Sequence, residues 1–173
     1  MKTVYSIAQI NSMTDEEFVH AIGPVFENSP WIAGATEALR PFSSNKSLHE
    51  KLCETVRASS EAQQLALIRA HPDLVGGTAL QGTLTPESAR EQTSAGLGKL
   101  SAEEIQQFQS CNAAYRKKFE FPFVICARLN KIEAILAGLE KRLRHSRETE
   151  IKISLEEIFK IAGLRLKDLV SED

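Results

Sequence analysis

Helix-starting signals recur along this chain and constrain its fold more than any other sequence feature. Thr14, Ser60 and Ser101 are each followed three positions later by Glu or Gln, which is the spacing of a capping box. In the residues that follow each signal, apolar side chains recur every three or four positions, as on the buried face of a helix. The one β-prone run, PFVIC, has no second strand to pair with. The sequence therefore predicts an all-α fold.

Eight segments carry this helical pattern, and together they cover most of the chain. They are residues 14–26, 31–39, 47–59, 60–71, 85–97, 101–119, 128–143 and 154–170. No repeat or low-complexity linker separates them, and 173 residues fit one domain of ordinary size. We therefore expect residues 1–173 to form a single compact domain of roughly eight helices. Irregular segments are expected at about residues 71–84 and 120–126.

The composition excludes several classes of protein. The net charge is −2, so nucleic acid is not an expected partner. No apolar run approaches the ~20 residues that cross a bilayer, so no membrane partner is expected either. The first residues, MKTVYSIAQINSM, lack the apolar core of a signal peptide, and the final LVSED carries no lipidation signal. These features predict a cytoplasmic protein.

The three cysteines, Cys53, Cys111 and Cys126, are an odd number without close pairing. In a cytosolic protein this pattern is typical of reduced, buried thiols. The alternative is a catalytic cysteine, but none of the three has a sequence neighbour that would activate a thiolate. No His or Cys spacing matches a metal site, and the glycine-rich stretch after HPD lacks the lysine of a phosphate loop. We therefore expect no metal site and no phosphate-binding loop.

One titratable side chain stands where a helix must end, in the stretch IRAHPDLVGG. Pro72 disfavours helical geometry at the residue before it, so His71 is expected on extended backbone. The glycines that follow permit backbone angles that other residues avoid. His71 is therefore predicted to lie on a fixed loop, where binding and catalytic groups are often found.

Three further segments combine polar groups or free backbone with apolar surroundings, and each has a purely structural alternative. In SAREQ, the side chains of Ser88, Glu91 and Gln92 share one helix face, which is either a binding surface or a solvated polar face. In FEFPFVIC, the proline-broken segment is either a pocket wall with free N–H groups or a hydrophobic plug. Arg165 either meets an anion or lies at the surface with its stem over apolar side chains.

Four blocks, HPDLVGG, SAREQTSAGL, NAAYRKKFEFPFVIC and KIAGLRLKDL, occur in this order. In this combination the chain, from about Phe18 to Val170, resembles the 2-oxo-4-hydroxy-4-carboxy-5-ureidoimidazoline (OHCU) decarboxylases of urate degradation. The resemblance implies an all-α, cofactor-independent homodimer that converts this small-molecule ureidoimidazoline to (S)-allantoin and carbon dioxide. The alternatives are a non-catalytic helical interaction domain and a related ureide-processing enzyme on the same fold.

The resemblance also implies roles for individual residues. The implied catalytic residues are His71, Glu91 and Arg165. The implied substrate-binding residues are Pro72, Ser88, Gln92, Phe121, Phe123, Val124 and Ile125, with backbone contacts from the last four. Two positions depart from the family, because Glu120 stands where glycine is usual and Gly77 where a larger polar residue is common.

These residue types suit a decarboxylation in which the substrate's own imine accepts the electron pair that carbon dioxide leaves behind. The protein then has to orient the substrate, stabilise charge and move protons. We expect His71 to handle a proton, on the substrate hydroxyl or at the carbon that loses carbon dioxide, since an unperturbed histidine has a pKa of about 6.5. Arg165 offers a planar fork of donors to a carboxylate or carbonyl. Backbone N–H groups after Pro122 would bind the oxygen that gains charge.

Overall fold

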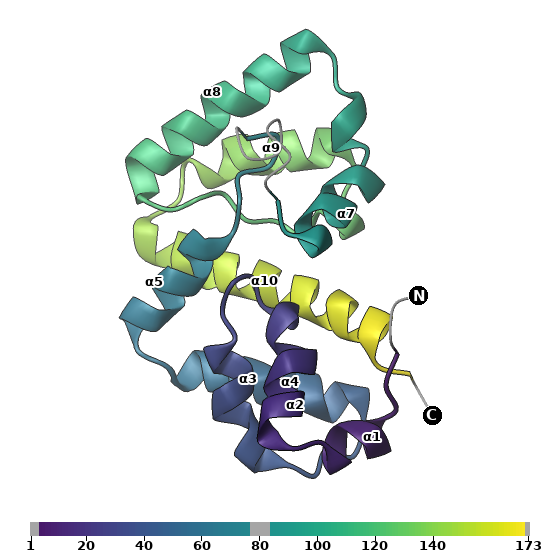
Figure 1. Cartoon of the computed structure of the whole chain (residues 1–173). Helices are drawn as coiled ribbons and strands as arrows, with labels where there is room; N and C mark the ends of the chain where they lie inside the picture. Colours follow the sequence, from purple (N-terminus) through teal and green to yellow (C-terminus); the bar gives the residue numbers. More distant parts are fainter. Residues whose placement is uncertain (1–3, 77–83, 172–173) are drawn as a thin grey trace. The chain divides into compact units, whose positions relative to one another are not determined.

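A computed structural model describes residues 4–76 and 84–171 of the chain (Figure 1). Its α-helices are α1 (Ile7–Ser12), α2 (Asp15–Ile22), α3 (Trp31–Thr36), α4 (Asn45–Ala58), α5 (Glu61–Ala70), α7 (Pro86–Ser94), α8 (Ala102–Phe119), α9 (Ile132–Arg142) and α10 (Arg147–Leu169). Within these residues the β structure is limited to one isolated bridge, between Tyr5 and Val170. The predicted all-α fold is therefore confirmed. None of the described helices is both long enough and apolar enough to cross a membrane.

Internal contacts divide the chain into two compact units. Unit 1 is Met1–Ala70 together with Phe159–Asp173, and unit 2 is His71–Ile158. Helix α10 contributes to both, because its residues up to Ile158 belong to unit 2 and the following ones to unit 1. The organisation of residues 1–173 as a single domain stays a prediction.

The helix starts follow the signals in the sequence. The capping boxes predicted at Thr14, Ser60 and Ser101 are all formed, and they precede α2, α5 and α8. Thr85 caps α7, whose first residue is Pro86, as expected from a proline that has no N–H to satisfy. Local side-chain chemistry therefore decides where these helices begin.

Two helices differ from the sequence prediction. The short helix α1 was not predicted, although Ser6 forms a complete capping box in front of it. Helix α10 begins at Arg147, well before the expected residue 154. Its start is capped by Ser146, whose hydroxyl accepts the Thr149 N–H at 3.2 Å. Helix α1 is too short to show an apolar period, and α10 starts in polar sequence, so the apolar periodicity that guided the prediction is weak at both starts.

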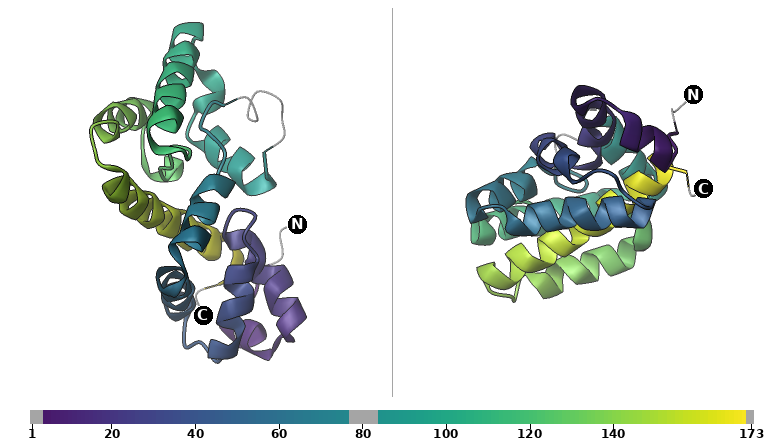
Figure 2. Two further views of the ribbon diagram at one scale, coloured as in Figure 1. Left: turned by 90° about the vertical axis from the view of Figure 1, so that its left-hand side faces the viewer. Right: turned by 90° about the horizontal axis from the view of Figure 1, so that it is seen from below.

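Unit 1 is built from α1 to α5 and the last part of α10. Helix α2 packs on α3, and α3 packs on α4. The unit buries a set of large apolar side chains, which includes Ile10, Phe18, Ile22, Ile32, Leu48 and Leu52. The first described residues lie beside the end of α10 (Figures 1 and 2), where the Tyr5 N–H donates to the Leu169 carbonyl at 2.9 Å. This pairing closes the unit with residues from both ends of the chain.

Unit 2 contains α7, α8, α9 and the first part of α10, and its core includes four buried aromatic rings. The rings are those of Tyr115, Phe119, Phe121 and Phe123. The Tyr115 centroid lies 4.5 Å from that of Phe119 and 5.4 Å from that of Phe123, in tilted and edge-on arrangements that aromatic pairs prefer. The hydrophobic-plug interpretation is therefore correct for these rings, and the backbone of the same segment has to be considered separately.

Helix α8 ends at a residue in the left-handed conformation. Glu120 has φ 65° and ψ 22°, and its N–H donates to the Arg116 carbonyl at 2.9 Å. A side chain in this region costs about 1–2 kcal/mol, which explains why glycine is usual at such a position. Glu120 is exposed, so it adds no buried charge to the turn. Residues 120–126 form an irregular segment, as predicted, and are called the phenylalanine loop below.

Candidate active site

His71 directly follows the last residue of α5 and opens an irregular segment, residues 71–76, which we call the histidine loop. The expectation that the helix stops before Pro72 is confirmed. The His71 side chain is buried, and Pro72 is partly exposed. Gly77 and the remaining residues of the predicted irregular segment, up to residue 83, lie outside the described residues.

Two amide side chains hold the histidine loop by its backbone. Asn112, on α8, donates from Nδ2 to the Leu74 carbonyl at 2.7 Å. Gln92, on α7, accepts the Val75 N–H through Oε1 at 3.3 Å. Both amides are buried, so these bonds satisfy backbone groups that have no helical partner. The loop that carries His71 is thereby tied to two helices of unit 2.

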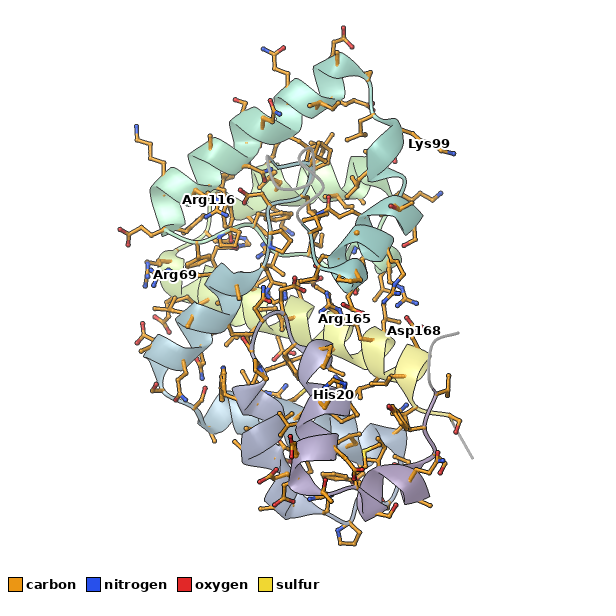
Figure 3. The ribbon with its side chains drawn as sticks, viewed as in Figure 1. His20, Arg69, Lys99, Arg116, Arg165 and Asp168 are labelled. Carbon is orange, nitrogen blue, oxygen red and sulfur yellow. The ribbon has the colours of Figure 1, made fainter. Side chains whose placement is uncertain are left out.

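The histidine loop also contains two tight backbone features. Val75 has φ 54°, a left-handed conformation that is unusual for a β-branched residue. A Cβ atom on Gly76 would lie 2.7 Å from the Cβ of Asp73, so only glycine fits there. Arg116, on α8 (Figure 3), pairs with the Asp73 carboxylate at 2.7 Å and holds this turn from outside. Such strain persists where surrounding contacts impose it.

Helix α7 presents a buried polar face between the two loops. Ser88 is 5% and Gln92 is 7% exposed, so the interpretation of this face as a solvated surface is wrong for these two side chains. Gln92 contacts the histidine loop, as described above. Glu91 lies near enough to the phenylalanine loop for its charge to contribute to raising the pKa of Cys126. One helix thus brings polar groups to both irregular segments.

The phenylalanine loop is fixed by charged side chains at two neighbouring peptide groups. Arg142 donates from Nη1 to the Val124 carbonyl at 2.6 Å, and the Glu157 carboxylate accepts the Cys126 N–H at 2.8 Å. Within the described ranges, no hydrogen bond uses the N–H groups of residues 123–125. Buried backbone N–H groups are nearly always paired, so this stretch offers donors to a ligand.

Cys53 and Cys126 are buried thiols, and Cys111 is partly exposed. Burial is the main cause that raises the pKa of Cys126 to about 11, and the nearby carboxylates of Glu157 and Glu91 add to it. Burial also raises the pKa of Cys111. Cys53 is buried, and its Sγ lies 3.4 Å from Nε2 of His49. All three are free cysteines, and the raised pKa values argue against a catalytic thiolate at Cys111 and Cys126.

Arg165 is buried and paired, so the interpretation as a surface arginine is wrong. It is 4% exposed, and its Nη2 donates to Oε2 of Glu27 at 2.9 Å. Its Nη1 donates to the Pro24 carbonyl at 3.3 Å. Arg165 (Figure 3) and both of these partners belong to unit 1, whereas the other predicted site residues belong to unit 2. Its place in the active site stays a prediction.

Sequence reasoning missed the side chains that hold the two loops. They are Asn112, Arg142, Glu150 and Glu157. Glu150 carried the clearest signal, because it lies at helical spacing from Ser154 and the buried Ile158 and so falls on the apolar stripe of α10. Among residues 4–76 and 84–171, no group of three or more His, Cys, Asp or Glu side chains is arranged to hold a metal ion.

Comparison with known proteins gives the family. The model of the OHCU decarboxylase family matches residues 11–167. The OHCU decarboxylase of Halalkalicoccus jeotgali is 40% identical over 167 residues, which cover 96% of this chain and 93% of that protein. That of Amia calva is 41% identical over 162 residues, which cover 94% of this chain and 93% of that protein.

A solved structure agrees with these relatives. The crystal structure of (S)-allantoin synthase superposes with a TM-score of 0.75 at 29% identity, over 94% of this chain and 53% of that chain. The predicted resemblance is therefore confirmed by a family match, by relatives that align over nearly their full length, and by a shared fold. This chain belongs to the OHCU decarboxylase family.

Proposed function

We propose that this protein is a carboxy-lyase that converts 2-oxo-4-hydroxy-4-carboxy-5-ureidoimidazoline to (S)-allantoin and carbon dioxide in urate degradation. The observation that carries this proposal is the family match over residues 11–167, which includes every polar residue that the reaction needs. A non-catalytic interaction domain does not explain why the four polar blocks occur in the order of the family. The comparisons favour the decarboxylase over that alternative.

The reaction requires one carbon–carbon bond to break and three protons to move. The bond between the carboxyl carbon and the ring breaks, carbon dioxide leaves, and its electron pair enters the adjacent imine. The negative charge spreads over the imine nitrogen and the conjugated 2-oxo oxygen. The hydroxyl proton is then lost, the former imine nitrogen gains a proton that neutralises it, and a further proton is added to the former imine carbon, which becomes the stereocentre of allantoin. The protein's task is to stabilise this charge and to deliver that proton to one face.

We assign the proton transfers to His71, because a buried imidazole on a fixed loop can hold one geometry throughout the reaction. Glu91 orients the imidazole or accepts substrate N–H groups, and Ser88 and Gln92 match the amide edges of the substrate. Pro72 packs against the bound ring. Arg165 binds a carboxylate or a carbonyl oxygen with its planar fork, whose orientation Glu27 fixes in unit 1.

The phenylalanine loop supplies the donors for the oxygen that gains charge. The backbone of Phe121, Phe123, Val124 and Ile125 is the proposed contact, and the uncommitted N–H groups of residues 123–125 support it. Such donors act where negative charge develops and are fixed before the reaction begins. The rings of Phe121 and Phe123, which are both buried, exclude water from the core side of the phenylalanine loop.

The proposal has four further parts, which rest on the sequence and the resemblance. The enzyme works without a cofactor, since the substrate provides its own electron sink. It acts on a small molecule and has neither nucleic acid nor a membrane as its partner. It is a homodimer, and it is located in the cytoplasm. Its residues 1–173 fold as one domain.

The test is a coupled assay. The ureidoimidazoline is generated in place from urate with the two upstream enzymes, this protein is added, and the circular dichroism of the allantoin is followed. We expect a faster and strongly one-handed signal, whereas unaided decay gives a slow signal near zero. Product analysis by mass distinguishes a related ureide-processing reaction. Identical traces with and without the protein would overturn the proposal.

A further inference from the structure

Unit 2 contains a buried charged cluster that the proposed reaction does not use. We call it the Arg142 cluster, and its members are Tyr115, Arg142, His145, Glu150 and Ser154. The fully buried Glu150 carboxylate accepts Arg142 Nε at 2.9 Å, His145 Nδ1 at 2.7 Å and the Tyr115 hydroxyl. Burial raises the pKa of Tyr115, so its hydroxyl keeps its proton and donates. These contacts leave the guanidinium a single orientation.

The stability of the fold does not by itself account for a buried charged cluster of this kind. Buried ion pairs are often no more stabilising than apolar residues of the same volume, because both charges lose their hydration. What such a cluster does provide is a charge held in one place. In this molecule, the charge is held against the phenylalanine loop.

Arg142 contacts the phenylalanine loop in two ways. Its Nη1 donates to the Val124 carbonyl at 2.6 Å, a short bond of the charge-assisted kind. Its guanidinium carbon lies 4.5 Å from the centroid of the Phe123 ring, in a cation–π contact. The arginine therefore fixes both the backbone and a side chain of the segment that is proposed to contact substrate.

Because the peptide bond is planar, Arg142 also determines the direction of the N–H group on the other side of the backbone. In a trans peptide the carbonyl of Val124 and the N–H of Ile125 lie in one plane and point in opposite directions. When Arg142 binds that carbonyl, the Ile125 N–H must point away from the Arg142 cluster. The next peptide is held as well, because Glu157 accepts the Cys126 N–H at 2.8 Å. The positive charge of Arg142 beside the Val124 carbonyl also polarises this peptide group, which makes the Ile125 N–H a stronger donor.

We propose that Arg142 is a positioning residue for the decarboxylation, which aims and polarises the Ile125 N–H toward the oxygen that gains charge. This inference rests on the proposed function. Arg142 does not touch the substrate, and it acts through the Val124–Ile125 peptide. Glu150 orients Arg142 in turn, and Ser154, at 3.1 Å from Nη2, assists.

The experiment compares Arg142→Lys with Arg40→Lys in the coupled assay. Arg40 is a matched control in unit 1, because it too binds backbone carbonyls (two, where Arg142 binds one), pairs with a carboxylate, that of Asp15, and lies 5.1 Å over an aromatic ring, that of Phe18. Lysine keeps the charge at both positions but loses the fork. Both variants should lower the melting temperature.

Only Arg142→Lys should change catalysis in the protein that remains folded. We expect its kcat to fall about 10- to 100-fold with KM changed less than about threefold, because the donor acts on charge that appears in the transition state. Ser154→Ala removes one contact of Arg142 and should lower kcat only a few-fold. It keeps the inference testable if Arg142→Lys does not fold. The Arg40→Lys variant should keep the wild-type kcat.

Three contrary outcomes are distinguishable. If kcat stays at the wild-type value in Arg142→Lys and in Ser154→Ala, the Arg142 cluster only stabilises the fold and the inference is wrong. If KM rises while kcat is unchanged, Arg142 affects ground-state binding, which also overturns the inference. If the wild-type protein itself gives no acceleration, the proposed function has failed, and the inference fails with it for that separate reason.

Discussion

The two loops of unit 2 are held in opposite ways. The backbone of the histidine loop is tied by the neutral amides of Asn112 and Gln92, and the loop includes a strained residue, Val75. Its charged contact, the Arg116–Asp73 pair, is more exposed. The phenylalanine loop is fixed by the charges of Arg142 and Glu157 and contains no left-handed residue after its first. One loop carries the proposed proton donor, and the other carries the proposed backbone donors.

The difference corresponds to what each loop is proposed to do. A hydrogen bond between neutral groups contributes about 0.5–1.5 kcal/mol net, whereas one to a charged group contributes about 1.5–3 kcal/mol. Donors that stabilise charge gain from rigidity, because they must not reorganise during the reaction. His71 also has to keep one geometry, but its acid–base group is a side chain and not a backbone N–H, so neutral contacts to the backbone of its loop suffice. The predictions below test this contrast.

The largest expected effect is on turnover, from His71→Asn. Removing a positioned acid or base typically lowers the rate about 10²–10⁴-fold, so turnover should fall at least about 100-fold. His20→Asn is the control, because His20 is an exposed histidine of unit 1 and should leave turnover unchanged. Both rates are measured by circular dichroism in the coupled assay and corrected for folded protein. Near-normal turnover in the His71 variant would show that the proton role is wrong.

A smaller effect is expected from removing the main contact of the histidine loop, at Asn112. Asn112→Leu leaves the buried Leu74 carbonyl without its donor and should lower the free energy of unfolding by about 1–3 kcal/mol. Asn112→Asp places a carboxylate oxygen against that carbonyl, so the loss should be larger, about 3–5 kcal/mol. Urea unfolding at neutral pH measures both.

The Asn112 variants also bear on catalysis. In both, kcat should fall because the loop that carries His71 loses its buried bond to α8 and keeps the more exposed Arg116–Asp73 pair. Equal stability of Asn112→Leu and the wild type would show that this amide does not hold the histidine loop, and the contrast between the loops would then rest on Gln92 alone.

A gain in stability is expected at the start of the phenylalanine loop. Glu120→Gly removes a side chain from the left-handed region and should raise the free energy of unfolding by about 1 kcal/mol, less the greater freedom of the unfolded chain. Lys117→Gly, at an exposed position inside α8, should lower it by about 1 kcal/mol. Opposite signs in urea unfolding support the assigned backbone conformation. Destabilisation by both would contradict it.

The sequence allowed the helices and the irregular segments to be predicted because their signals are local. A capping box spans four residues, and Pro72 acts on the residue beside it. Helix α1 was not predicted, because a helix of so few residues shows too little apolar periodicity to be recognised. The site residues were predicted from the resemblance, which combines motifs that are each weak alone, and they stay a prediction.

The residues that hold the loops could not be predicted for the same physical reason. The bond from Asn112 to Leu74 joins residues 38 positions apart, and that from Arg142 to Val124 joins residues 18 positions apart. No local pattern encodes such a pair, because the partners meet only after α8 and α9 have packed. In the sequence, Arg142 has the appearance of an ordinary basic residue in the last turn of a helix.

The smallest effect is expected at Cys126, the thiol of the phenylalanine loop, on its rate of alkylation and on the pH dependence of stability. The raised pKa of Cys126, about 11, leaves roughly one thiolate in a thousand at pH 8, so iodoacetamide should alkylate Cys126 far more slowly in native protein than in urea. In the unfolded chain the pKa of this thiol is about 8.5. The native state therefore holds more protons than the unfolded state between about pH 8.5 and 11, and stability should decline as pH rises through this window. Cys126→Ala should remove that part of the decline, measured by urea unfolding at several pH values. Rapid native alkylation at pH 8 would show that the phenylalanine loop opens, and the charges of Arg142 and Glu157 would then not make it the more rigid of the two loops.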